Sequence, residues 1–200
     1  MDIERLEKQL RFIIEADKLK TVLRRTHLIC DKEKFENDAE HSWHLTLEAL
    51  LLFEYVVGKD KIDLFRVLKI LIVHDLVEIG AGDTYCYDEI ALRDKEQREK
   101  DAADSLYSLL PEDQKNEFLS LWEEYEEQQT QEAKYAAVID RIQPLLQIYY
   151  TQGSTWLEHG INLKQELKRN EILRDIAPAL WDYAKEIICE SAKRGYLKDV

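Results

Sequence analysis

The segment ILIVHDLVEIGAGDT, residues 70–84, places ionisable side chains in an otherwise apolar run. On a helix, residues three and four apart share a face, so His74, Asp75 and Glu78 form one stripe. An imidazole nitrogen and a carboxylate oxygen can bind one divalent cation, and a carboxyl group one turn further on can exchange a proton. Burying these three groups costs free energy unless a cation or several hydrogen bonds compensate them. The stripe therefore indicates a metal site, with a hydrogen-bonded core pair as the alternative for His74 and Asp75 alone.

Two ligands hold a divalent ion poorly, so a metal site requires further His or Asp side chains on other buried helices. The sequence offers His41 in NDAEHSWHL, on a helix that either Asn37 or Asp38 can cap, and Asp140 in AAVIDRIQPLL. His44 lies one turn after His41 on the same face, and spacing alone does not choose between them. Two His and two Asp ligands would leave open positions for water and substrate on an octahedral ion. Such a set suits manganese, cobalt, iron, nickel or zinc better than calcium.

The elements that must position these residues are predicted to be helices. With 6 Gly and 3 Pro in 200 residues, the chain has few residues for the turns of an all-β fold, so we expect an all-α protein. No repeat or linker divides it, and one domain over residues 1–200 is the simplest organisation. The run from Val67 to Val77 is apolar almost all round, which predicts a central helix that ends at Gly80. Helices are expected over about residues 3–17, 38–58, 63–80, 88–109, 132–150 and 176–194, with a further helix that starts at Pro111.

Charge and cysteine content exclude several classes of protein. The formal net charge of −13 at pH 7 argues against a protein that grips a nucleic acid polymer or an anionic membrane surface. The N-terminus is charged from its second residue and no apolar run reaches membrane-spanning length, so neither a signal peptide nor a membrane helix is expected. Cys30, Cys86 and Cys189 are widely spaced and odd in number, which favours reduced thiols and the cytoplasm.

The order of the candidate ligands resembles that of the HD-domain metal-dependent phosphohydrolases, in which an adjacent His-Asp pair stands between an earlier His and a later Asp. The motifs AEHSWH, VHDLVEIGAGDT and DRIQP are similar to those of the small HD-domain 5'-deoxynucleotidases. The resemblance also covers LKTVLRRT before the first ligand, and LPEDQ and LWEEYE between the third and the last. It implies a single HD-domain helical bundle, with a metal site between the central helices, that forms a homodimer.

The resemblance also implies a role for each matching residue. One of the paired arginines would hold the phosphate, and Arg25 is preferred to Arg24 because it directly precedes Thr26, as in the R-T sequence of the family. Glu78 would serve the water on the metal side and proton transfer to the departing sugar oxygen, and Asp83 would contact the sugar. Four residues, rather than His44, would bind one divalent transition metal, with manganese and cobalt named before zinc, iron and nickel: His41, His74, Asp75 and Asp140.

The activity that the resemblance implies is hydrolysis of (deoxy)ribonucleoside 5'-monophosphates, small-molecule nucleotides, to nucleoside and phosphate. Close relatives place an aromatic residue after the arginine, where this chain reads RRTHL, so selectivity between deoxyribose and ribose stays open. One alternative is an HD hydrolase of another small phosphate ester or of a nucleoside triphosphate, although a triphosphate should demand more basic residues than the paired arginines supply. A non-catalytic metal-binding scaffold is the other, but a structural metal site is normally closed.

Overall fold

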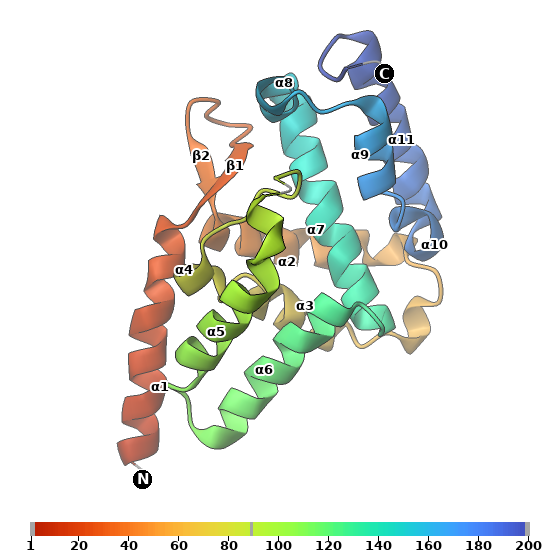
Figure 1. Cartoon of the computed structure of the whole chain (residues 1–200). Helices are drawn as coiled ribbons and strands as arrows, with labels where there is room; N and C mark the ends of the chain where they lie inside the picture. Colours follow the sequence, from red (N-terminus) through yellow and green to blue (C-terminus); the bar gives the residue numbers. More distant parts are fainter. Residues whose placement is uncertain (1–2, 89, 199–200) are drawn as a thin grey trace.

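The chain folds into a mostly helical structure with one small sheet (Figure 1). This computed structural model describes residues 3–88 and 90–198. The expected all-α class is confirmed, although β1 (Leu23–His27) and β2 (Phe35–Asn37) pair as an antiparallel hairpin. No helix in the described part of the chain is long and apolar enough to cross a membrane. The helices are α1 Ile3–Ala16, α2 Asp38–Leu52, α3 Leu64–Val73, α4 Glu78–Ala81, α5 Lys95–Tyr107, α6 Glu112–Glu127, α7 Gln131–Tyr150, α8 Ser154–His159, α9 Leu163–Arg169, α10 Leu173–Ile176 and α11 Pro178–Lys193.

The 20-residue helix α7 forms the centre of the core. It contacts α2, α3, α6 and α11, and Figure 1 shows it between α3 and the C-terminal helices. Its buried face carries Ala133, Ala136 and Ala137, whose small side chains let the neighbouring helices approach closely. Asp140 lies on the same helix, and its carboxylate reaches the His41 ring on α2.

The predicted central helix stops at the His-Asp pair. The sequence predicts one helix over residues 63–80, but α3 ends at Val73 and α4 begins only at Glu78. In the turn between them, the amides of Leu76 and Glu78 bond to carbonyls three residues back, at 3.1 and 3.0 Å, instead of four. This tighter winding redirects the chain, and Asp75 and Glu78 then line one cavity.

The start of α2 depends on local hydrogen bonds. Asn37 is the N-cap of α2, because its side chain accepts from the Glu40 amide at 3.0 Å while the Glu40 carboxylate accepts from the Asn37 amide at 3.2 Å. Of the two candidate caps, Asn37 therefore holds the position, and Asp38 is the first helical residue. The helix predicted over residues 88–109 begins only at Lys95, after a short 3-10 turn.

Candidate metal centre

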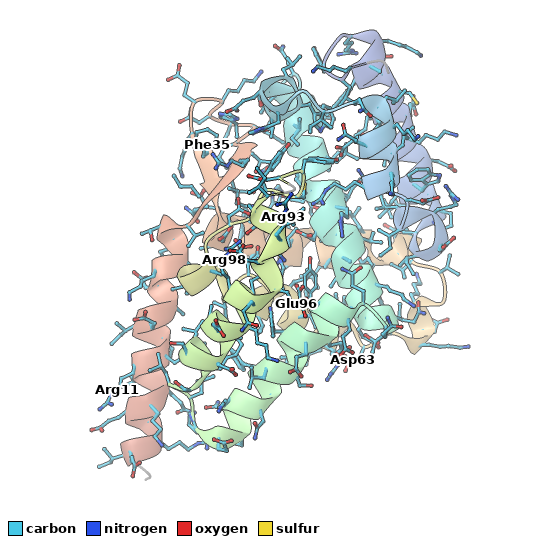
Figure 2. The ribbon with its side chains drawn as sticks, viewed as in Figure 1. Arg11, Phe35, Asp63, Arg93, Glu96 and Arg98 are labelled. Carbon is cyan, nitrogen blue, oxygen red and sulfur yellow. The ribbon has the colours of Figure 1, made fainter. Side chains whose placement is uncertain are left out.

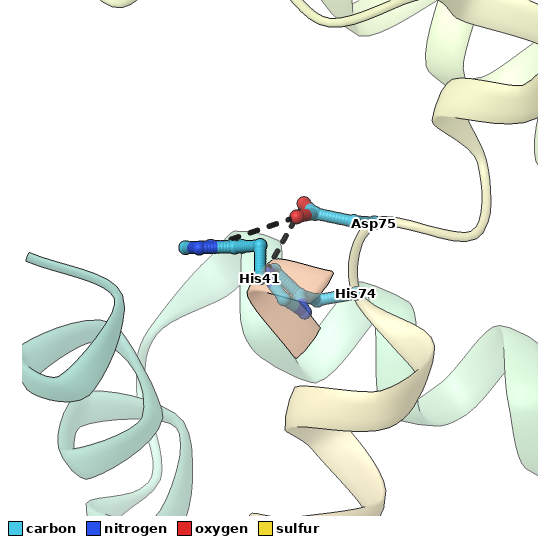
Figure 3. Close-up of side chains that lie close together, drawn as sticks. All are labelled: His41, His74 and Asp75. Carbon is cyan, nitrogen blue, oxygen red and sulfur yellow. Dashed lines mark ion pairs between the residues drawn. The ribbon is translucent and has the colours of Figure 1, made fainter. Parts of the chain in front are cut away.

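The four expected metal ligands meet where α2, the end of α3 and α7 converge. His41 Nε2 lies 3.1 Å from Asp140 Oδ1 and 3.8 Å from Asp75 Oδ2, and His74 Nε2 lies 3.1 Å from Asp75 Oδ1. Figure 3 shows the Asp75 carboxylate joined to both rings. One potential ligand atom from each of His41, His74 and Asp75 lies within 4.8 Å of the others, and all three residues are buried. Residues that are far apart in the sequence thus bring two imidazole nitrogens and the Asp75 carboxylate together, and Asp140 adjoins this group through His41.

Each imidazole has one nitrogen occupied on the side away from this cluster. His74 Nδ1 lies 3.0 Å from the Leu71 carbonyl, which can only accept, so Nδ1 donates and Nε2 is the nitrogen left for a cation. His74 Nε2 is buried and has no hydrogen-bond partner among the described residues. His41 Nδ1 likewise lies 3.0 Å from Gln143 Oε1. Two rings that offer Nε2 beside two carboxylates fit the donor set of a divalent transition metal.

The carboxylates around His41 favour its protonated, positively charged form. Burial and the charge of Arg24 push the pKa of His41 down, but hydrogen bonds to Asp140 and Glu36 outweigh them and raise it to about 9. A bound cation would displace this proton, because a metal ligand must be the neutral imidazole.

A buried amide network behind His41 was not foreseen from the sequence. Glu36 Oε1 accepts from Gln143 Nε2 at 2.8 Å and from Gln147 Nε2 at 2.6 Å. The first of these bonds fixes which end of the Gln143 amide faces His41. His44 touches the network only from outside, with Nδ1 3.3 Å from Gln143 Nε2. The one sequence signal for this support was the glutamine of the DRIQP motif.

Arg24, rather than Arg25, extends into the cluster. Its Nη1 donates to Asp75 Oδ2 at 3.0 Å and to Asp38 Oδ1 at 3.2 Å. Burial disfavours its charge, but Asp75 and the other carboxylates outweigh burial and raise its pKa well above the ordinary value. Arg25 follows it on β1, is exposed, and lies in the wall of the adjoining pocket. Successive side chains of a strand point to opposite faces, so the two arginines lie in different environments. Which of them holds a phosphate stays a prediction.

Glu78 lies beside a second unforeseen residue, Asp38. Oxygens of Asp38, Asp75 and Glu78 lie within 4.8 Å of one another, and all three residues are buried. Burial, then the charges of Asp75 and Asp38, raise the pKa of Glu78 well above its ordinary value. Burial likewise raises the pKa of Asp38 to about 6. Glu78 therefore holds its proton more tightly than an ordinary glutamate does, which suits a group that supplies a proton.

Asp83 completes one side of the cavity. It follows Gly82, whose φ of +77° is a conformation that side-chain-bearing residues rarely adopt. Arg98 on α5 ties this segment down by donating to the Ala81 carbonyl at 2.6 Å and the Thr84 hydroxyl at 3.0 Å (Figure 2). The cavity holds about 270 Å³. Its wall includes Arg24, His74, Asp75, Glu78, Asp83 and Asp140.

Comparisons with known proteins agree with this geometry. Residues 16–181 match the family model described as HD domain. A mouse protein named 5'-deoxynucleotidase HDDC2 is 33% identical over 138 residues, which cover 69% of this chain and 67% of the mouse protein. A Dictyostelium discoideum protein of the same name is 30% identical over 163 residues, which cover 80% of this chain and 86% of that protein. The chain spans about two thirds of the length of the vertebrate relatives it matches.

A solved structure is similar over nearly the whole chain. It belongs to a predicted metal-dependent phosphohydrolase from Magnetospirillum magnetotacticum MS-1, with a TM-score of 0.88 and 44% sequence identity. The alignment covers 97% of this chain and 96% of that one. A conserved hypothetical protein from Pyrococcus furiosus aligns with a TM-score of 0.60 and 30% identity, over 92% of this chain and 99% of the other.

Proposed function

We propose a function from the premise that this chain belongs to the HD-domain family, whose model it matches over residues 16–181. We infer that it is a metal-dependent phosphomonoesterase that hydrolyses nucleoside 5'-monophosphates to nucleoside and phosphate. The observation that carries the chemistry is the convergence of two buried imidazole Nε2 atoms on two carboxylates. The substrate class follows from the relatives that are named 5'-deoxynucleotidase. We treat residues 1–200 as one domain of this type and expect it in the cytoplasm.

The proposed ligands are His41, His74, Asp75 and Asp140, and the proposed ion is a divalent transition metal. Manganese and cobalt are the first candidates, followed by zinc, iron and nickel, because all accept mixed nitrogen and oxygen ligands. When bound, such an ion polarises the phosphoryl group as a Lewis acid. The open cavity of about 270 Å³ beside these ligands favours catalysis over a scaffold role.

The other side chains would each handle a charge or a proton of the substrate. Arg24 offsets the negative charge of the phosphoryl group, and Arg25 lies further out on the same strand. Glu78 gives its proton to O5' of the departing nucleoside as the P–O5' bond breaks and a water oxygen takes its place on phosphorus. Asp83 accepts a hydrogen bond from a sugar hydroxyl. This assignment differs from the sequence-based preference in using Arg24 for the phosphate.

Phosphate release from a panel of ribonucleoside and 2'-deoxyribonucleoside 5'-monophosphates tests this function. Activity should require manganese or cobalt, and Asp75→Ala and His41→Ala should each lower it by at least about a hundredfold, as expected when a metal ligand is lost. His44→Ala is the matched control, since His44 lies outside the cluster, and it should keep most of the activity. Release that depended on neither the metal nor Asp75 would refute the proposal.

We also propose that the protein forms a homodimer through α1. Five apolar residues of this helix face solvent, and its inward face carries Arg5 and Gln9 together with the buried Phe12. Arg5 donates to Asp113 at 2.7 Å, and Gln9 donates to Gln114 at 2.8 Å. Apolar residues three and four apart form the seam that pairs two helices. The outward residues, with exposed fractions between 42% and 71%, are Ile3, Leu6, Leu10, Ile13 and Ile14.

A further inference from the structure

A second pocket adjoins the metal centre and is lined by arginines. It holds about 80 Å³, which is room for several water molecules and therefore for a group the size of phosphate. Asp83 and Cys86 line both this pocket and the larger cavity of the metal centre, so the two spaces adjoin each other. We call it the arginine pocket, after the side chains of Arg25, Arg141 and Arg169 in its wall.

These three arginines lack the ion pairs with carboxylates that most of the other described arginines make. Arg24, Arg66 and Arg98, for example, each pair with a carboxylate. Within residues 3–88 and 90–198, the side chains of Arg25, Arg141 and Arg169 make no ion pair within 4.0 Å and no hydrogen bond. Arg25 is exposed, but Arg141 and Arg169 are half-buried, and the Nε of Arg141 is fully buried without a partner.

Among the described residues, the carboxylates nearest to this pocket make no ion pair within 4.0 Å with its three arginines. Glu166, in the pocket wall, already accepts hydrogen bonds from Tyr87 Oη at 2.6 Å, Trp156 Nε1 at 3.1 Å and Asn170 Nδ2 at 2.9 Å. Asp140 binds His41 and Tyr125 in the metal centre. Asp83 is the remaining carboxylate of the described pocket wall.

The ring of Tyr87 also holds one of the cations in place. The guanidinium carbon of Arg169 lies 5.9 Å from the centre of this ring, a distance typical of a cation–π contact. Half-buried guanidinium groups without a carboxylate partner are costly unless an anion compensates them. In a chain with a net charge of −13, this local excess of positive charge singles out the pocket.

We infer that the arginine pocket binds a second anionic group of the substrate, a phosphate beyond the one that is hydrolysed. This inference rests on the proposed phosphatase function and extends its substrate class from nucleoside 5'-monophosphates to nucleotides that carry a second phosphate group. In a nucleoside 3',5'-bisphosphate the second group is the 3'-phosphate, and in a 5'-diphosphate it is the phosphate that stays on the nucleoside when the terminal one is released. A guanidinium binds both alike. Arg141 and Arg169 add two basic residues to the paired arginines Arg24 and Arg25 in the pocket wall.

Steady-state kinetics on the metal-loaded full chain test the inference. We would compare 2'-deoxyadenosine 5'-monophosphate with the 3',5'-bisphosphate and the 5'-diphosphate, and the preferred compound identifies where the second phosphate sits. We expect at least one of the two larger substrates to have a KM about tenfold lower than the monophosphate, the effect of one charge-assisted contact. Arg169→Gln and Arg141→Gln should each remove most of this difference in KM, and Arg169→Lys should retain part of it. Arg93→Gln, at an exposed surface site, is the control and should leave the difference unchanged (Figure 2).

Equal KM values for all three substrates would overturn the inference. So would an Arg169→Gln variant in which KM rises by the same factor for all three substrates. Calorimetric titration with inorganic pyrophosphate separates this failure from failure of the proposed function. Binding that Arg169→Gln weakens about tenfold and Arg93→Gln leaves intact supports the pocket, even if no nucleotide is hydrolysed. Pyrophosphate binding that does not depend on Arg169 counts against it, even if the monophosphate is hydrolysed well.

Discussion

Four carboxylates lie within 4.0 Å of the single guanidinium of Arg24. One positive charge does not compensate four buried negative charges, since each unpaired carboxylate carries a large desolvation cost. The raised pKa values of His41 and Glu78 are the response of neighbouring groups to this excess of negative charge. A divalent cation held by the four proposed ligands would contribute further positive charge. The same carboxylates thus explain two properties of the site. They lower the stability of the protein when no cation compensates them, and they favour the binding of a metal ion.

Gln143 is the residue through which the buried network should act on the metal. The Oε1 atom of Gln143 orients His41 by accepting a hydrogen bond from its Nδ1. A leucine at this position has no atom that can accept this bond. We expect Gln143→Leu to weaken metal affinity by about tenfold to a hundredfold, the usual effect of losing a group that orients a metal ligand. Isothermal titration with manganese measures this, with Gln129→Leu on the exposed α6–α7 connection as the control. Unchanged affinity in Gln143→Leu would mean that the network does not position His41.

Glu48 should make the protein less stable as the pH rises. It is 8% exposed, its Oε2 lacks a partner among the described residues, and burial raises its pKa to about 8 from 4.5. Between these two values the folded state binds more protons than the unfolded state, so this group lowers stability progressively from pH 4.5 to 8. Glu48→Gln removes the penalty, and its gain in unfolding free energy should grow from about 1 kcal/mol at pH 5 to about 4 kcal/mol at pH 8. Urea unfolding at pH 5 and pH 8 checks the sign, and a gain that was constant with pH would contradict it.

At the scale of elements, the start of α2 couples helix capping to the metal centre. The capping box of Asn37 and Glu40 fixes the first turn, which carries both Asp38 and His41. An equivalent box, Asn162 with Gln165, starts α9 outside the metal centre. The two caps therefore form a matched pair in which only one is tied to the metal ligands.

We expect Asn37→Ala and Asn162→Ala each to lower the free energy of unfolding by about 1 kcal/mol, because a helix start loses its side-chain acceptor. Only Asn37→Ala should also weaken manganese binding, since it loosens the turn that presents His41. Urea unfolding and calorimetry on both variants make the comparison. Equal metal affinity in the two variants would show that the α2 cap serves stability alone.

Helix periodicity predicted most of the helical fold, and the family motifs indicated four residues that the structure brings close together. The break after Val73 was missed because apolar residues resume at Leu76 and Val77, directly after the His-Asp pair. The choice between Arg24 and Arg25 depends on which face of β1 turns inward, and that follows from its pairing with β2. The role of Glu36 was hidden because its partners, Gln143 and Gln147, lie on a helix more than a hundred positions away.

At the scale of the whole molecule, exposed apolar side chains of the described residues gather on α1 and on α2. The first group is the outward seam of α1, and Figure 1 places this helix along one edge of the molecule. The second lies on α2 and includes Trp43, Leu47 and Leu51, which expose 65%, 40% and 64% of their surface. Exposed apolar patches of this kind mark interaction surfaces. The spacing of the α1 residues, alternately three and four, is that of two paired helices, so we assign the dimer contact to α1.

The α1 seam predicts how the oligomeric state responds to a buried charge. Ile13→Glu places a carboxylate in the centre of the apolar seam, and two copies of it would face each other in a dimer with no partner. We expect this variant to be monomeric at a concentration where the unaltered chain is a dimer, as measured by size-exclusion chromatography with light scattering. Leu51→Glu, on the α2 surface, is the matched control and should stay dimeric, with both variants keeping their helical content. If Leu51→Glu alone dissociated the dimer, the contact would lie on α2, and a monomeric unaltered chain would refute the homodimer itself.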